Sequence, residues 1–290
     1  MSSFSEEFDT DFREARRRVF REPDRKKGNG KTASRVGTQG KFVDPGTTAG
    51  ISRNDFYAYM PTHTYIFRPT GELWPASSVN SRLPTGKGSR TTSRWLDQYK
   101  PVEQMTWVPG EPEIIEGRLV SEGGWIERKG SKVFNLYRPP NRLRKSGPAD
   151  LWKDLLLRLY GADANHIERW LAHRVQRPGE KINHALVLGG AQGVGKDTVL
   201  VPVKQAVGPW NFSEVSPRQM LGRFNGFLKS VVCRVSEAHD LGDIDRYAFY
   251  DHLKTYITAP PDVLRVDEKN TREYSVPNVL GIIINPQLPP

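Results

Sequence analysis

Cysteine and long apolar runs are what this sequence most clearly lacks. Its 290 residues include one cysteine, which excludes an internal disulfide framework and a zinc site built from cysteines. No apolar run approaches the roughly 18–20 residues that cross a bilayer, so we expect no membrane partner. The N-terminal residues contain no apolar segment typical of a secretory signal. These absences predict a soluble protein of a reducing compartment, the cytoplasm.

Acidic residues are the scarcer charged type. Lys and Arg number 43 against 33 Asp and Glu, which gives a formal net charge of +10. The 26 Gly and 22 Pro predict a large share of turns, while 7 Trp, 12 Phe and 10 Tyr supply enough apolar bulk for a core. The length suits one large domain or two ordinary ones.

The first half of the chain divides into a polar arm and a mixed region. Residues 1–50 are predicted to be a disordered basic arm, because six basic and no acidic residues occur between Arg25 and Lys41. The arm is either a solvated linker or a segment attracted to phosphates. Residues 51–147 are predicted to be a small mixed α+β region. There, strand-like alternation around Lys129–Gly130 predicts a hairpin.

Residues 148–182 have a helical period and predict a lead-in of two helices. Gly161 is expected just after the end of the first helix, and Asp163 at the N-cap of the second. The apolar positions expected to face the core are Leu151, Leu155 and Leu159 in the first helix and Ile167, Trp170 and Leu171 in the second.

A glycine-rich loop follows a predicted apolar strand at 184–189 and precedes a helical run. Its spacing, G-x-x-x-x-G-K from Gly190 to Lys196, is typical of a phosphate-binding loop. The glycines allow backbone N–H groups to point at phosphate oxygens, and the helix N-terminus adds its positive dipole end. Lys196 would reach the β- and γ-phosphates. The predicted nucleotide-binding residues are Gly190, Ala191, Gln192, Gly193, Val194, Gly195, Lys196, Asp197 and Thr198.

One position of this loop departs from the usual pattern. The residue after the lysine is commonly Ser or Thr, whose hydroxyl binds Mg²⁺, and here it is Asp197, followed by Thr198. Either Thr198 or Asp197 would then bind the metal, because a hydroxyl and a carboxylate are both hard oxygen ligands. The expected cofactors are ATP and Mg²⁺.

Two further polar residues follow strand-like runs. Glu237 ends the run that starts at Ser230 and could orient the attacking water as a general base. Asn285 ends the run 279–284, where a side-chain amide could bind the γ-phosphate or the water. Lys196, Glu237 and Asn285 are therefore the predicted catalytic residues.

The order of these motifs resembles that of the superfamily 3 helicases, in particular the primase-associated ATPases of phages and plasmids. The segment WLAHRVQRPGEKINHALVLGGAQGVGKDT resembles their entry into the ATPase core, and DRYAFYDHLKTYITAPPDVLRVDEKNTREYSVPNV resembles their B′ region. The resemblance covers residues 165–285. It implies an α/β P-loop fold of the AAA+ kind in residues 183–290, a hexamer, and movement along single-stranded DNA.

The resemblance also implies residue roles and partners. Basic residues of the B′ region would grip the DNA backbone, and a primase would act with the protein in a bacterial or phage-infected cell. The implied DNA-binding residues are Lys254, Arg265, Lys269 and Arg272.

Two departures from the family define an alternative. No polymerase or primase carboxylate motif occurs in residues 1–150, and the sequence ends five residues after Asn285, before the position of the family's arginine finger. From this truncation we expect slow hydrolysis, poor ring assembly and an exposed sheet edge. The first hypothesis is an ATP-driven DNA helicase or translocase core of a phage-type replication protein. The second is a hydrolysis-impaired fragment that binds nucleotide or DNA.

Overall fold

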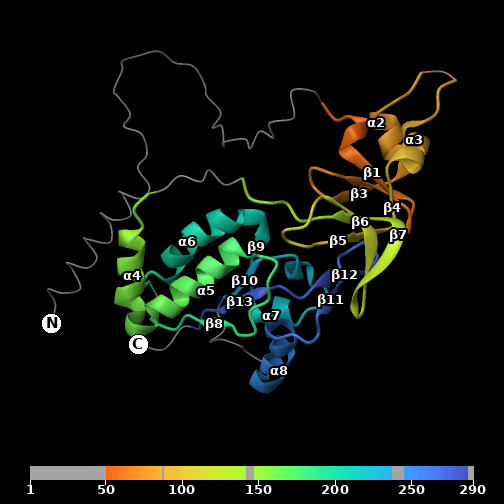
Figure 1. The fold of residues 1–290 in the computed structure, drawn as a ribbon. Coiled ribbons are helices and arrows are strands. Elements are labelled where there is room, and N and C mark those ends of the chain that lie inside the picture. The colour runs from red at the N-terminus through yellow and green to blue at the C-terminus, as the bar shows by residue number, and fades with distance from the viewer. Residues whose placement is uncertain (1–49, 87, 142–146, 192, 237–244, 287–290) are drawn as a thin grey trace, which may run out of the picture. The chain divides into compact units, whose positions relative to one another are not determined.

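A computed structural model describes residues 50–86, 88–141, 147–191, 193–236 and 245–286. The chain divides into two compact units, one of residues 1–50 with 148–151 and the other of residues 51–147 with 152–290. Apart from Gly50, the predicted basic arm lies outside the described residues. The second unit is a mixed α/β assembly with parallel and mixed sheets (Figure 1). Within the described ranges, no helix combines the length and the apolar character needed to cross a membrane.

The first sheet of this unit follows a capped turn of 3₁₀ helix, η1 (Arg53–Asp55), in which Ser52 and Asp55 form a capping box. Its strand order is β3-β2-β1-β4. The strands are β1 (Phe56–Tyr59), β2 (Thr64–Phe67), β3 (Glu72–Trp74) and β4 (Pro101–Val102), and the helices α2 (Ala76–Arg82) and α3 (Thr92–Tyr99) lie between β3 and β4 in the chain. Phe56, Tyr65 and Leu96 are fully buried in the small core that strands and helices share.

The second sheet corrects the hairpin predicted around Lys129–Gly130. Its order is β5-β7-β6, with β5 (Gln104–Thr106), β6 (Ile114–Ser121) and β7 (Gly124–Asn135). The β6–β7 turn lies at 122–123, so residues 124–135 form one strand. Glu116 pairs with Lys132 but Arg118 pairs with Glu127, so Lys129–Gly130 lies in a bulge of β7, where Gly130 has φ +82°. The residues at Lys129–Gly130 thus interrupt the regular pairing with β6 as extra residues of β7, but they do not end the strand.

The third sheet contains four parallel strands in the order β8-β13-β10-β9. They are β8 (Leu186–Val187), β13 (Gly281–Ile284), β10 (Val232–Val235) and β9 (Phe212–Val215). Short, continuously apolar runs such as 281–284 are typical of strands covered on both faces. The antiparallel pair β11 (Val263–Val266) and β12 (Tyr274–Pro277) forms a separate hairpin.

Helices connect and cover these strands. They are α4 (Asp150–Tyr160), α5 (Ala164–Gln176), α6 (Lys196–Val207), α7 (Pro217–Met220) and α8 (Arg246–Ile257), with the 3₁₀ turns η2 (Gly161–Asp163), η3 (Pro209–Asn211) and η4 (Gly226–Leu228).

The helical lead-in agrees with the sequence in most details. Gly161 follows α4 with φ +53°, and Asp163 occupies the N-cap of α5, although its side chain makes no capping hydrogen bond. Ile167, Trp170 and Leu171 are buried. In α4 the buried residue is Leu156, while the predicted Leu155 and Leu159 are only partly buried. Leu151, also predicted to face the core, is exposed, so that prediction was wrong.

Arg174 of α5 is a fully buried arginine that the sequence pattern does not reveal. Its Nη2 donates to the carbonyl oxygens of Pro178 and Val279, both at 2.8 Å, and its Nε donates to that of Val231 at 3.3 Å. A Cβ added to Gly281 would lie 2.9 Å from Arg174, so only glycine allows this approach. Arg174 therefore ties α5 to the chain just before β10 and β13.

We predict that Arg174→Leu lowers the free energy of unfolding by about 3 kcal/mol or more, because buried carbonyl groups lose their donor. Urea denaturation measures this. The control is Arg177→Leu: Arg177 is exposed and pairs with Glu180 at 3.5 Å, so its loss should cost within about 0.5 kcal/mol. Equal effects of the two substitutions would contradict the role of Arg174.

Candidate nucleotide-binding site

The predicted strand, loop and helix are present in that order. The strand is shorter than expected, since β8 spans Leu186–Val187 at the edge of its sheet, although the backbone N–H of Leu188 still donates to Ile284 at 2.9 Å. Three loop glycines have left-handed backbones: Gly190, Gly193 and Gly195, with φ +139°, +81° and +103°. Gly195 is the N-cap of α6, so the loop leads directly into the helix N-terminus.

Lys196 is the first residue of α6 and is only 8% exposed. Its Nζ donates to the carbonyl oxygens of two residues of the same loop, Gly190 and, at 3.2 Å, Ala191. No carboxylate of the described residues forms an ion pair with it. The side chain therefore turns back over the loop, and its charge meets only neutral acceptors. Gln192 lies outside the described residues.

The residues after the lysine differ in environment. Asp197 is exposed, and its Oδ1 accepts from Nη2 of Arg234, a residue of β10. Thr198 is half-buried. In the parts of the chain described, no three His, Cys, Asp or Glu side chains gather as metal ligands.

Asn285 and the end of β10 lie at the carboxyl edge of the parallel sheet. Asn285 is 3% exposed, and its backbone N–H donates to Val235 at 3.0 Å. The N–H of Ser236 donates to Val215 at 3.0 Å on the other side of β10. Glu237, the predicted general base, lies outside the described residues, so its place remains a prediction.

Sequence reasoning missed Arg234. Its guanidinium contacts Asp197 of α6, Glu214 of β9 and Asn285, which directly follows β13. The available signal was an arginine within the otherwise apolar run 231–235, which is unexpected for a buried strand. Glu214 of β9 also accepts from Nζ of Lys204 at 2.8 Å. Lys204, and then Arg234, hold the pKa of the Glu214 carboxyl below its usual value.

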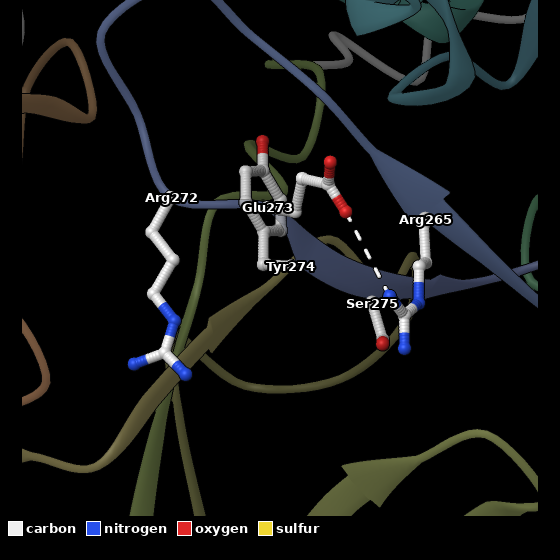
Figure 2. Close-up of a pocket in the computed structure, with 5 residues that line it drawn as sticks. All are labelled: Arg265, Arg272, Glu273, Tyr274 and Ser275. Atoms are coloured by element: carbon white, nitrogen blue, oxygen red, sulfur yellow. Dashed lines mark ion pairs between the residues drawn. The ribbon is translucent and has the colours of Figure 1, made fainter.

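The predicted DNA-binding residues are only partly brought together. Arg265 and Arg272 line a hollow of about 460 Å³ with Glu273, Tyr274 and Ser275 (Figure 2). Arg265 pairs with Glu122 of the β6–β7 turn and lies 3.8 Å from Glu273. Lys269 is exposed in the turn between β11 and β12. Lys254 lies on α8 instead, paired with Asp251 at 2.9 Å.

The chain is similar to one sequence family and to several solved structures. A family of unknown function (DUF5906) matches residues 188–287. The apo structure of the NrS-1 C-terminal region (305–718) has 21% identity and a TM-score of 0.62 over 80% of this chain and 54% of that one. An A-form apo structure of the same region has 20% identity and a TM-score of 0.60, covering 80% and 53%. No curated protein matches the sequence.

At this identity the likeness to the solved structures shows the fold. The chain spans about half of the length of those structures. The family match begins at the end of β8 and includes the loop, α6, β10 and Asn285.

The glycine at the N-cap of α6 generates a stability prediction. Gly195→Ala should lower the free energy of unfolding by about 1–2 kcal/mol, because φ +103° is unfavourable for a residue with a Cβ. Gly86→Ala is the control, since an added Cβ there meets nothing closer than 3.9 Å and the backbone is not left-handed. Denaturant unfolding of both variants measures the difference, and an equally stable Gly195→Ala would show that the loop does not need this conformation.

Proposed function

We propose that residues 190–198 bind ATP with Mg²⁺ and that the chain is the ATPase of a phage-type replication protein. The observation that carries this proposal is Lys196, a nearly buried ammonium whose contacts among the described residues are carbonyl oxygens of its own loop. Burying a charge without a counter-ion is costly, so such a site favours an anion. The loop also lies outside the carboxyl ends of parallel strands, where open α/β sheets bind ligands.

In this proposal each residue has one task. The loop N–H groups and Lys196 hold the phosphates, and an oxygen of Thr198 or Asp197 holds Mg²⁺. Bound Mg²⁺ would neutralise charge on the β- and γ-phosphates. Glu237 accepts a proton from the attacking water, and Asn285, which directly follows β13 at the same edge, orients the γ-phosphate or that water.

The nucleic-acid part of the proposal rests on the β11–β12 hairpin. Arg272 and Lys269 are exposed and form no ion pair with a described residue, whereas Arg265 and Lys254 are paired with acidic side chains. Unpaired cations attract a phosphate backbone without reading its sequence. Single-stranded DNA is therefore the proposed partner, with self-association into a ring and a primase as further partners that the resemblance implies.

ATP hydrolysis measured with and without single-stranded DNA separates the two hypotheses. DNA-stimulated turnover supports a helicase or translocase core. Nucleotide binding without turnover supports the hydrolysis-impaired alternative.

The first prediction of this proposal concerns the loop lysine. Lys196→Ala should weaken ATP binding by about 2–3 kcal/mol, because a charge-assisted contact to phosphate is lost. Glu237→Gln should keep ATP binding and stop hydrolysis. Calorimetry and a phosphate-release assay measure the two effects. Lys132→Ala, on β7, is the charge-matched control and should bind ATP as the unchanged protein does. Unaltered affinity in Lys196→Ala would refute the site.

The second prediction concerns DNA. Lys269→Ala and Arg272→Ala should each weaken binding to single-stranded DNA and reduce the slope of log affinity against log salt by roughly 0.7. Arg158→Ala is the control, because Arg158 pairs with Asp154 on α4 at 2.9 Å, away from the hairpin in sequence. Fluorescence anisotropy with oligonucleotides of mixed sequence measures both quantities. Binding that does not vary with salt would contradict the assignment.

A further inference from the structure

Arg234 joins three segments around the proposed nucleotide site. Nη2 pairs with Asp197 in the first turn of α6, and Nη1 lies 3.1 Å from Oε1 of Glu214 on β9. The Asn285 amide, oriented with its oxygen toward the guanidinium, accepts from Nε at 3.0 Å and from Nη2 at 3.1 Å. The Arg234 side chain is 17% exposed, so these contacts are only partly screened by water.

The charges around α6 alternate in sign. Lys204 near the end of the helix pairs with Glu214, Glu214 pairs with Arg234, and Arg234 pairs with Asp197 at the start of the helix. Because Lys204 already offsets Glu214, the charge of Arg234 remains available to Asp197. Both ends of α6 are thereby fastened to the sheet.

A carboxylate directly after the loop lysine poses an electrostatic problem for a phosphate site. An unpaired carboxylate at that position would repel a polyphosphate bound by the loop. The pairing with Arg234 cancels this charge and holds the carboxylate toward β10. The half-buried hydroxyl of Thr198 is then the side-chain oxygen of the first turn that has no cationic partner among the described residues.

We propose that Arg234 is a positioning residue of the nucleotide site: it holds Asp197 as an ion-pair partner, so that Asp197 neither repels the phosphates nor ligates Mg²⁺, and Thr198 binds the metal. This inference rests on the nucleotide site proposed above. In this inference the ion pair with Arg234 neutralises the carboxylate of Asp197 in the first turn of α6. The same guanidinium also contacts Asn285.

The decisive experiment measures the dissociation constant of ATP in EDTA and in saturating Mg²⁺. Asp197→Asn should tighten binding of metal-free ATP by about threefold or more, because the positive charge of Arg234 is then no longer offset. It should leave Mg²⁺-ATP binding no weaker. The charge-matched control is Glu116→Gln, whose side chain is 69% exposed on β6, and it should change neither constant. If Asp197 were a metal ligand, Asp197→Asn would weaken Mg²⁺-ATP only, and that result overturns the inference.

A second arm tests Arg234 itself. Arg234→Met should weaken metal-free ATP by about fivefold or more, and adding Asp197→Asn should restore the affinity to within about twofold of the unchanged protein. Arg234→Lys should restore the affinity for metal-free ATP only in part, because a lysine lacks the planar guanidinium that donates to several acceptors at once. If Arg234 has a purely structural role, adding Asp197→Asn to Arg234→Met will not restore the affinity for metal-free ATP. That result would refute the inference. Should Arg234→Met fail to fold, the Asp197→Asn comparison decides alone.

Lys196→Ala distinguishes a failure of the proposed nucleotide site from a failure of the inference about Arg234. If ATP does not bind, or binds equally well to Lys196→Ala, the nucleotide site and the inference both fail. If binding depends on Lys196 but metal-free ATP is not tightened by Asp197→Asn, only the inference fails.

Discussion

Backbone hydrogen bonding among four parallel strands is the constraint on which the site depends. β10 pairs with β13 on one side and β9 on the other, and β13 pairs with β8. The pairing continues past the strand ends, where the N–H groups of Leu188, Ser236 and Asn285 donate to neighbouring strands. All segments therefore leave the sheet at one edge, which brings Lys196 and Asn285 to the same end of the sheet although they are far apart in sequence.

Two arginines hold opposite edges of this sheet. Arg174 donates to the carbonyls of Val231 and Val279. Val231 directly precedes β10, and Val279 lies two residues before β13. Arg234 follows on β10 and contacts Asp197 and Asn285 at the carboxyl edge. One guanidinium is fully buried among neutral oxygens and the other is shared between carboxylates and an amide. The first fixes helix α5 to the sheet, and the second fixes the start of α6.

Local patterns in the sequence were sufficient for much of the fold. The glycine spacing around Lys196, the turn glycine Gly161 and the apolar face of α5 are set by neighbouring residues, and each appears where it was expected. The partners of Arg234 could not be predicted, because they depend on which strands are adjacent and in what register. The hairpin predicted at Lys129–Gly130 was wrong for a related reason: pairing with β6 extends β7 through the turn signal and converts it into a bulge.

The loop lysine connects stability with the proposed function. Among the described residues, the buried ammonium of Lys196 has carbonyl oxygens but no carboxylate as partners, so they leave part of its desolvation cost without an offset. An anion that accepts from Lys196 supplies that charge, and its binding free energy adds to the stability of the folded chain. Arg234 favours such an anion too, because it pairs with the Asp197 carboxylate in the first turn of α6, which would otherwise repel the anion. In the proposed site, the cost of burying Lys196 and the pairing of Asp197 with Arg234 would therefore both favour a polyphosphate over a neutral ligand.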